Sequence, residues 1–384
     1  MQDIFIIGSK GIPAKYGGFE TFVEQLTRYT KSSKIRYHVA CMADQKGEFE
    51  YQGSHCFQIK VPRIGPAKAV WYDLAAFAWC LNYIKRHAVR RPVVYVLACR
   101  IGPFTGFLKH MLKKSEGRLF VNPDGHEWMR AKWNKAIRKY WKFSERLMVK
   151  HADLLICDSK NMEIYIRDTY RKYRPSTTFA AYGADVAKSR LSDDDPKLLA
   201  WYGKWNLKPF EYYLIVGRFV PENNYETMIR EFMQAKTDKK LAIISNVEEN
   251  AFYQKLKNIT GFENDKRIVF CQTVYEEELL KKIRENAFAY LHGHEVGGTN
   301  PSLLEALGST DVNLLFDVGF NREVGEKAAL YWTKENGNLS ALIEKTAEFD
   351  EKLRKDWGTK AKQRILSDYR HEQIAETYEK IFLE

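Results

Sequence analysis

The sequence is poor in the features that mark several large classes of protein. It has only six cysteines in 384 residues and no Cys-x-x-Cys pair, which argues against zinc-ribbon and disulfide-stabilised domains. We therefore expect buried free thiols in a reducing compartment. The longest apolar stretch, 69–84, contains Asp73 and Asn82 and is too short and too polar to span a bilayer. Asp3 interrupts the N-terminal apolar run, so no signal peptide is expected.

Two common phosphate-binding motifs are also absent. The glycine-rich loop at 8–21 has neither the Gly-x-Gly-x-x-Gly spacing of dinucleotide sites nor the Walker spacing of P-loops. It does contain the adjacent pair Gly17 and Gly18 just before an expected helix, and such a pair lets a backbone approach a phosphate or a sugar. A flexible surface loop is the alternative interpretation.

Acidic residues are the minority among the charged ones. The chain has 61 Lys and Arg against 49 Asp and Glu, which gives a formal net charge of +12 and a pI of about 9.2. This balance indicates an anionic partner: a nucleic acid, an acidic membrane face or a phosphorylated substrate. With 45% hydrophobic and 29% charged residues, packed globular domains are expected rather than disorder.

Short apolar runs alternate with amphipathic segments along most of the chain. This alternation predicts an α/β fold with two doubly wound domains, each a parallel sheet with helices on both faces. The expected strands are 4–8, 37–42, 57–61, 93–98, 119–122, 154–158, 178–181, 213–216, 241–245, 268–271, 287–291 and 313–316. The expected helices are 18–29, 71–86, 130–150, 161–171, 225–236, 249–259, 276–285, 301–308, 338–366 and 369–383.

The domain boundary is expected after the run 182–185, where the chain becomes charged. The run 193–196, Asp-Asp-Asp-Pro, is a plausible start for the first helix of the second domain. We therefore predict domains at 1–185 and 186–366. Two such domains would leave a cleft between the carboxyl ends of their strands, where α/β sheets bind ligands.

The most informative stretch runs from 287 to 308. A short apolar strand is followed by a turn of histidine and glycine and then by a helix that starts near Pro301. Backbone N–H groups point out of a helix start, so this corner suits a diphosphate. Glu305, about one turn further on, would accept hydrogen bonds from ribose hydroxyls. An ordinary strand–turn–helix corner would not need the other polar residues. The candidate residues are His294, Glu295, Gly298, Thr299, Asn300 and Ser302.

Charged and polar side chains follow several other expected strands. Arg218 comes just past 213–216, where a guanidinium can clamp diphosphate oxygens, although an interdomain ion pair is the alternative. After 119–122, ionisable side chains suit acid–base work or hydroxyl binding. Two later strands end in residues that act directly or order the site by hydrogen bonding. The candidate residues in the first half of the chain are Asp124, His126, Glu127, Asp158 and Tyr182. For His126, Asp158 and Tyr182, a structural role is the alternative.

The segment 129–150 is strongly basic and has aromatic residues interleaved with the cations. It contains a single acid, Glu145. Cations with aromatic anchors suit an anionic lipid surface. Nucleic acid, or a solvated face over buried tryptophans, are the alternatives. The candidate membrane or acceptor residues are Arg130, Lys132, Lys135, Arg138, Lys139 and Lys142.

In combination these motifs resemble those of retaining GT-B glycosyltransferases of family 4. The resemblance is carried by Gly17-Gly18, by Gly217-Arg218 and by the run Gly-Gly-Thr-Asn-Pro-Ser-x-x-Glu at 297–305. The runs 7–21 and 122–128 are similar to those of the bacterial rhamnosyltransferases that start rhamnose-rich cell-wall or capsular polysaccharides. The resemblance covers nearly the whole chain.

The resemblance implies two Rossmann-like domains facing a central cleft. Domain 1–185 would bind the acceptor and 186–366 the nucleotide sugar, with the last helix, about 367–384, packing back on the first domain. It implies β-1,4-L-rhamnosyl transfer with retention from dTDP-β-L-rhamnose to a lipid-linked sugar, preferably GlcNAc-diphosphate-undecaprenol. No metal or cofactor is expected. The protein would be cytoplasmic, peripheral on the inner face of the cell membrane, and would not bind nucleic acid.

The resemblance also assigns roles to the candidate residues. The diphosphate would be held by Arg218, by the helix start at 298–300 and by Ser302. The ribose would be held by Glu305, and the donor sugar would face His294 and Glu295. The reacting hydroxyl would face Asp124, His126 and Glu127.

Two positions depart from the family pattern. The family usually has a lysine five residues after the arginine, where this chain has Asn223, and a glutamate where it has Gly297, so Glu295 would substitute. Three alternatives stay open: a glucose-diphosphate-lipid acceptor, UDP-glucose or UDP-galactose as donor, and a non-catalytic nucleic-acid-binding protein.

Overall fold

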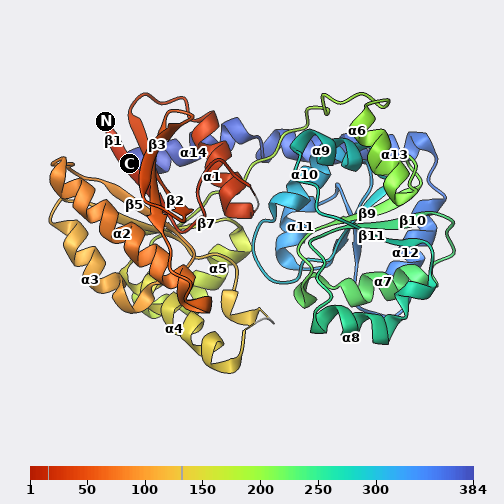
Figure 1. Ribbon diagram of the computed structural model, residues 1–384, viewed down its shortest axis with the longest axis horizontal. Coiled ribbons are helices and arrows are strands. Elements are labelled where there is room, and N and C mark those ends of the chain that lie inside the picture. The colour runs from red at the N-terminus through yellow and green to blue at the C-terminus, as the bar shows by residue number, and fades with distance from the viewer. Residues whose placement is uncertain (16, 131–132) are drawn as a thin grey trace. The chain divides into compact units, whose positions relative to one another are not determined.

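The computed structural model describes residues 1–15, 17–130 and 133–384, and these divide into two compact units. Unit 1 comprises Met1–Gly183, Gly297–Thr299 and His371–Glu384, and unit 2 comprises Ala184–Val296 and Asn300–Arg370. Each unit is built on its own sheet, which Figure 1 shows with helices around it. Among the described residues, no helix combines the length and the apolar composition that crossing a membrane requires.

The sheet of unit 1 has eight strands in the order β3-β4-β2-β1-β5-β6-β7-β8. All neighbouring pairs are parallel except β3 with β4. The strands are β1 (Gln2–Ile7), β2 (Ile35–Ala43), β3 (Gly47–Tyr51), β4 (Ser54–Lys60), β5 (Val93–Leu97), β6 (Arg118–Asn122), β7 (Leu154–Cys157) and β8 (Thr177–Phe179). The helices are α1 (Gly18–Tyr29), α2 (Lys68–Arg86), α3 (Gly102–Lys113), α4 (Lys135–His151), α5 (Lys160–Thr169) and α14 (His371–Leu383).

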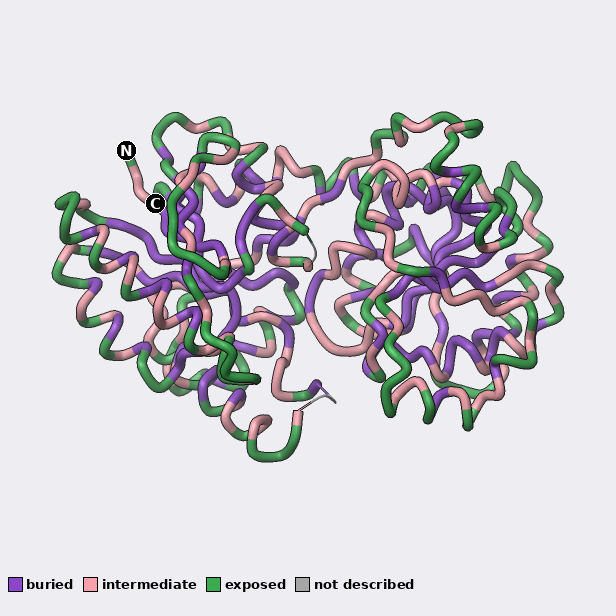
Figure 2. The backbone as a smooth tube through the Cα atoms, viewed as in Figure 1, coloured by how far each residue is buried: buried purple, intermediate pink, exposed green. Residues whose placement is uncertain are grey.

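Alternate residues of the unit 1 strands face opposite layers of helices. Phe5 and Val96 belong to the core with α2, α3, α4 and α5, whereas Tyr95, the strand neighbour of Val96, packs its ring against Tyr378 and Phe382 of α14. Both faces of the sheet are therefore covered, and its central strands are buried, whereas the edge strands β3 and β8 are partly exposed (Figure 2). Continuous apolar runs are what a parallel sheet with two covered faces requires.

The sheet of unit 2 is wholly parallel and has six strands in the order β11-β10-β9-β12-β13-β14. The strands are β9 (Tyr212–Val216), β10 (Lys240–Ile244), β11 (Ile268–Cys271), β12 (Ala289–His292), β13 (Asn313–Phe316) and β14 (Leu330–Trp332). The helices are α6 (Pro196–Trp205), α7 (Tyr225–Gln234), α8 (Ala251–Thr260), α9 (Glu277–Glu285), α10 (Pro301–Ser309), α11 (Gly319–Gly325), α12 (Asn338–Ala347) and α13 (Glu351–Asp368). Of these, α7, α8 and α12 share one core with the sheet, and α6, α9 and α10 share the other.

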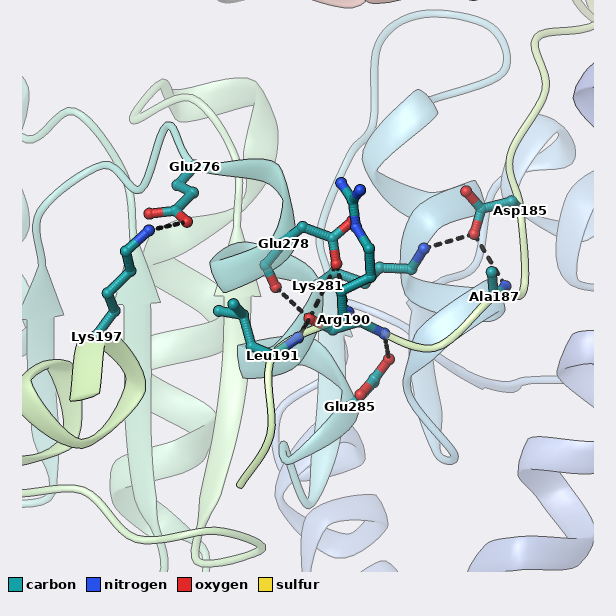
Figure 3. Close-up of polar contacts among 10 residues, drawn as sticks. Asp185, Ala187, Arg190, Leu191, Lys197, Glu276, Glu278, Lys281 and Glu285 are labelled. Atoms are coloured by element: carbon teal, nitrogen blue, oxygen red, sulfur yellow. Dashed lines mark hydrogen bonds and ion pairs between the residues drawn. The ribbon is translucent and has the colours of Figure 1, made fainter. Parts of the chain in front are cut away.

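The segment that opens unit 2 is tied to α9 by charged side chains (Figure 3). Asp185 pairs with Lys281 at 2.7 Å, and Glu278 accepts a hydrogen bond from the backbone N–H of Arg190 at 2.6 Å. Asp195 then caps α6, with Pro196 at its first position. The predicted helix start at 193–196 is confirmed, and the charged segment before it is anchored along α9.

All the predicted strands are present, and the structure adds two that the sequence did not reveal. Strand β3 alternates charged and apolar residues at the edge of its sheet, and it turns into β4 through Gln52 and Gly53, which both have positive φ. The predicted helix 338–366 is two helices, because Asp350 caps a new start at α13. The six cysteines are buried and free, as predicted.

Helix α3 was not predicted, because its glycines argue against a helix. Those glycines are needed where α3 meets α4. A Cβ at Gly102 would lie 2.3 Å from the carbonyl oxygen of Ser144, and one at Gly106 would lie 3.2 Å from the His151 ring. The Gly102 N–H donates to the Ser144 hydroxyl at 2.8 Å. Close approach of the two helices therefore selects glycine over a better helix former.

We expect Gly102→Ala to lower the free energy of unfolding by about 1–3 kcal/mol, since the new methyl group overpacks a backbone contact. Gly203 in α6 is the matched control, because a Cβ there meets nothing within 4 Å. Gly203→Ala should raise stability by about 0.5–1 kcal/mol. Urea unfolding followed by circular dichroism measures both changes. Equal effects of the two substitutions would contradict this account of α3.

Candidate functional site

In unit 2 the predicted anion site lies between β12 and α10. Helix α10 begins at Pro301, as predicted, and Asn300 caps it. The Asn300 Oδ1 atom accepts from the N–H groups of Ser302 at 2.9 Å and Leu303 at 3.3 Å. Pro301 has no N–H group, and the N–H groups of Ser302, Leu303 and Leu304 are all bonded to Asn300, so the helix dipole is what makes this end favourable for an anion.

The structure adds a cation to this corner that the sequence did not identify. Arg284 of α9 is 4% exposed. Its Nη2 atom lies 2.6 Å from Glu305 Oε2 and donates to Ser302 Oγ at 3.2 Å. Ser302 Oγ in turn donates to the carbonyl of Val216 at the end of β9. The buried guanidinium of Arg284 therefore holds Ser302 and Glu305, two of the predicted ligand residues. The sequence did not identify Arg284, because an arginine in an amphipathic helix has no pattern that marks it for this role.

The loop after β9 reaches the same edge of the unit 2 sheet as the loop after β12, because these strands are parallel neighbours. Arg218 is exposed at this edge. Asn223 is buried, and its Nδ2 donates to the backbone carbonyl of Arg218 at 2.8 Å. Asn224 Nδ2 donates to the carbonyl of Gly293 at 2.8 Å, which joins the two loops. Asn223 thus fixes the Arg218 backbone.

His294 and Glu295 follow β12 at this edge. The carboxylate of Glu295 pairs with Lys334 at 2.6 and 2.7 Å. Asn321 Nδ2 donates to the backbone carbonyl of His294 at 3.0 Å. Lys334 is a second cation that the sequence did not point to, since it is 39 residues from its partner.

In unit 1 the glycine-rich loop is held by carboxylates of α1. Glu20 accepts from the N–H of Lys10 at 2.6 Å, and Glu24 accepts from the N–H of Ala14 at 2.9 Å. Gly17 has a φ of 126° and precedes α1, which starts at Gly18 as predicted. A Cβ at Gly17 would lie 2.0 Å from the Glu20 carboxylate, so the glycine leaves room for that hydrogen bond.

The first residue of that loop is also held, by an arginine that follows β5. Arg100 donates to the carbonyls of Gly8 and Leu97. Its Nε lies 3.5 Å from Asp73, which is fully buried on α2. Burial raises the pKa of Asp73 to about 6, and the charge of Arg100 opposes that rise. The glycine loop is therefore attached to a buried ion pair.

After β6 the chain adopts a constrained turn around Asp124. Asn122 Oδ1 accepts from the Asp124 N–H at 2.8 Å, and Asn122 Nδ2 donates to the Tyr182 hydroxyl at 3.3 Å. Asp124 and His126 have φ values of 56° and 48°, which are strained for residues other than glycine. Burial raises the pKa of Tyr182 well above its ordinary value, so this phenol stays neutral and supports the turn.

His126 lies over aromatic side chains of the same unit. Its ring centroid is 4.2 Å from that of Tyr165, and burial lowers its pKa below the ordinary value. A neutral imidazole suits hydrogen bonding to a hydroxyl or acceptance of its proton. Glu127, the third predicted residue, pairs with Arg130 and accepts from the Trp133 indole at 2.8 Å. These two partners hold the Glu127 carboxylate within its own segment.

The buried acid beneath this turn is Glu145 of α4. It accepts hydrogen bonds from the hydroxyls of Tyr165 and Tyr170 and pairs with Lys142 at 3.1 Å. The Lys142 ammonium also lies 4.4 Å from the centre of the Trp128 ring. Lys142 is thus engaged inside unit 1, although the sequence placed it on a membrane-facing surface.

The other members of that predicted surface divide into two groups. Arg130 is buried against Glu127, and Arg138 donates to the Arg130 carbonyl at 3.2 Å. Lys135 and Lys139 are exposed. Lys132 lies outside the described residues.

Asp158 follows β7 and is 3% exposed. In unit 1 the hydroxyl of Thr299 donates to the Asp158 carbonyl. A Cβ at Gly298 would lie 2.0 Å from the Asp158 carboxylate, so only glycine fits there. The structure thus groups Gly298 and Thr299 with Asp158, whereas Asn300 and Ser302 form part of the α10 corner.

Comparisons with known proteins agree with this architecture. Residues 1–185 match the family described as "Domain of unknown function (DUF1972)". No curated protein matches the sequence. The chain is similar over 100% of its length to sucrose-phosphate synthase from Thermosynechococcus elongatus, with a TM-score of 0.78 at 15% identity and 98% of that chain covered. The fold is GT-B.

Two further GT-B structures also match over nearly the whole chain. The trehalose-phosphate synthase of Burkholderia xenovorans is 11% identical, with a TM-score of 0.76 and complete coverage of both chains. HepE from Anabaena is 12% identical, with a TM-score of 0.68 and 99% coverage of both chains. These values confirm the predicted fold.

The ion pair under the glycine loop gives a pH-dependent prediction. The pKa of Asp73 is about 6 in the fold, against an ordinary value of 3.8, so the folded state holds this proton more tightly than the unfolded state. Its contribution to stability therefore falls by about 3 kcal/mol as pH rises from about 4 to about 6. In Asp73→Asn this loss should be absent.

Urea unfolding of Asp73→Asn and of the unchanged protein, measured at several pH values from 4 to 7, tests this. The difference in unfolding free energy should grow in favour of the variant as pH rises. The same substitution at Asp168, an exposed residue of α5, is the matched control. A difference that stays constant with pH would show that Asp73 is ionised throughout.

Proposed function

We propose that the protein is a glycosyltransferase that uses a nucleotide sugar, and specifically a retaining β-1,4-L-rhamnosyltransferase. Its donor is dTDP-β-L-rhamnose, and its acceptor is a polyprenyl-diphosphate-linked sugar, preferably GlcNAc. The observation that carries the proposal is the α10 corner, where a capped helix start, Arg218 and Arg284 lie at one edge of the unit 2 sheet. That corner combines the exposed guanidinium of Arg218 with the positive end of the α10 dipole, which suits a nucleoside diphosphate.

The solved structures with this fold support the donor class. HepE is described in complex with UDP, and trehalose-6-phosphate synthase of E. coli is described bound with UDP-2-fluoro glucose. A study of trehalose-6-phosphate synthase describes glycosyl transfer with retention. The rhamnose donor and the lipid-linked acceptor are supported by the motifs at 7–21 and 122–128.

In the proposed reaction the bond between the anomeric carbon and the diphosphate oxygen breaks. The acceptor hydroxyl forms the new bond on the same face, and its proton passes to the departing diphosphate. Stabilising the charge on that diphosphate is the main catalytic task. Arg218 does so directly and the α10 dipole does so through its positive end, and Glu305, oriented by Arg284, binds the ribose.

The donor sugar lies against His294 and Glu295, whose carboxylate is oriented by Lys334. In unit 1, Asp124 and the neutral His126 orient the acceptor hydroxyl. Tyr182 supports their turn, and Glu127 holds the segment that follows through Arg130.

Arg218→Ala should lower turnover by about a hundredfold or more, because it removes a cation from the leaving group. The fold should survive, since Arg218 is exposed. Arg190→Ala is the matched control, as that exposed arginine pairs with Glu278 on α9. Turnover is measured by mass spectrometry of products after incubation with lipid-linked GlcNAc or glucose and a panel of nucleotide sugars.

The same assay identifies the substrates. If only dTDP-rhamnose gives a product, the full proposal is supported. If UDP-glucose or UDP-galactose gives a product, the proposed donor is wrong but the protein is still a glycosyltransferase. Near-normal turnover by Arg218→Ala would remove the leaving-group role. No turnover with any donor, together with salt-sensitive binding of generic DNA, would favour the nucleic-acid-binding alternative.

We also propose that unit 1 binds an anionic membrane through α3 and α4. The two helices pack against each other at Gly102 and Ser144. Phe104 and Phe107 of α3 are 47% and 68% exposed, and Phe143 of α4 is 45% exposed. Both helices lie wholly within the described residues, and their single acidic side chain, Glu145, is buried. The exposed lysines and arginines of the two helices are Lys113, Lys135, Lys139, Arg146 and Lys150, of which Arg146 lies over the Phe143 ring.

This surface differs from the sequence-based one, because it replaces the inward-facing Lys142 and Arg138 with α3 aromatics. Exposed aromatic rings between cations suit the interface of a bilayer that contains anionic lipid.

Reversing the charge of Lys135, Lys139, Arg146 and Lys150 should weaken binding to anionic liposomes by about a thousandfold, since each cation contributes roughly 1 kcal/mol. Four exposed lysines of unit 2, Lys327, Lys345, Lys352 and Lys360, give a matched control with the same change in net charge. Co-sedimentation with liposomes measures both variants. Equal loss from the two variants would indicate attraction by net charge rather than by this surface.

A further inference from the structure

The side-chain amide of Asn300 can be oriented without ambiguity. An amide has one end that accepts hydrogen bonds and one that donates them, and its orientation is assigned from its partners. The Oδ1 end accepts from the N–H groups of Ser302 and Leu303, as the cap of α10. The Nδ2 end must therefore point the other way, and it lies 3.0 Å from Nε2 of His294.

This contact determines where His294 carries its proton. Because Asn300 Nδ2 is only a donor, His294 Nε2 must be the acceptor and must be unprotonated. A neutral imidazole with a free lone pair on Nε2 has its proton on Nδ1. A proton on Nε2 would place two donors 3.0 Å apart and would break the contact.

The groups around His294 are consistent with a neutral ring. The His292 ring stacks on it at 5.4 Å with an interplanar angle of 12°. Burial lowers the pKa of His292 to about 3, so this neighbour is also neutral. The adjacent Glu295 carboxylate is paired with Lys334, and Glu222 meets this loop through its backbone carbonyl, which accepts from the Glu295 N–H.

We infer that Asn300 is a positioning residue that holds His294 as the neutral tautomer with its proton on Nδ1. The Asn300 side chain therefore caps α10 and also fixes which ring nitrogen of His294 can donate, since the same amide makes both contacts. His294 presents a constant N–H donor and does not act as a base through Nε2. That this donor meets an oxygen of a nucleotide sugar rests on the proposed function.

The tautomer is measured directly by nitrogen NMR of the full chain labelled with ¹⁵N-histidine, without any ligand. His294→Gln assigns the His294 signals. In the unchanged protein, Nδ1 should be protonated and Nε2 unprotonated. A protonated Nε2 in the unchanged protein would overturn the inference.

Two substitutions of Asn300 change its contact with His294 but keep an oxygen that can cap α10. Asn300→Asp keeps the capping oxygen but turns an acceptor towards His294, so Nε2 should become protonated. Asn300→Ser keeps a capping oxygen and removes the contact, so both tautomers should appear. Asn250→Asp is the matched control, because Asn250 caps α8 with the same side-chain geometry. It should leave the His294 signals unchanged, and an unchanged tautomer in Asn300→Asp would contradict the inference.

Calorimetry with dTDP and UDP separates this inference from the proposed function. Asn300→Ser adds no charge, and it should weaken nucleotide binding by about tenfold, as expected for loss of an oriented hydrogen bond to a charged ligand. Asn250→Ser should bind as the unchanged protein does. The predicted tautomer without any nucleotide binding would support the inference and contradict the proposed function. Nucleotide binding with a protonated Nε2 would support the proposed function and contradict the inference.

Discussion

The hydrogen bonds from Ser302 and Leu303 to the side chain of Asn300 are the interaction on which the unit 2 site depends. These bonds fix the position at which the loop after β12 ends and α10 begins. They therefore also fix where the helix dipole begins. Ser302, in the first turn, then meets Arg284 and the end of β9. Without this cap, the first turn would fray, and Arg284, Ser302 and Glu305 would lose their common frame.

Buried charges recur beneath each candidate residue cluster. Arg284 lies under the α10 corner, Asp73 lies under the glycine loop of unit 1, and Glu145 lies under His126. Burying an ion is costly and stabilises a fold little by itself. Each of these ions is paired with, or hydrogen-bonded to, residues that orient a loop. We interpret them as constraints on loop geometry, which keep backbone groups in place at the carboxyl ends of the strands.

The sequence predicted the elements well where a buried strand or an amphipathic helix produces a clear period. It failed at α3, where glycine serves the contact with α4, and at β3, where an edge strand is largely polar. It pointed to Arg218, Asn300 and Ser302 as candidates because each follows a strand or opens a helix. It could not find Arg284 or Lys334, since their partners are distant in the chain and ordinary surface helices also contain such residues.

By itself the sequence determined the class of fold, the order of the strands along the chain, the start of α10 and the buried state of the cysteines. These features depend on local periodicity and capping, which neighbouring residues decide. Only the tertiary structure decided which charges are available to a ligand or a membrane. Lys142 and Lys139 lie on the same basic helix, yet Lys142 is held by Glu145 and an aromatic ring while Lys139 is exposed. Part of that difference is local, because Glu145 lies three residues from Lys142 on α4, but the rest arises from Trp128 and Tyr165 of other elements, which no local pattern contains.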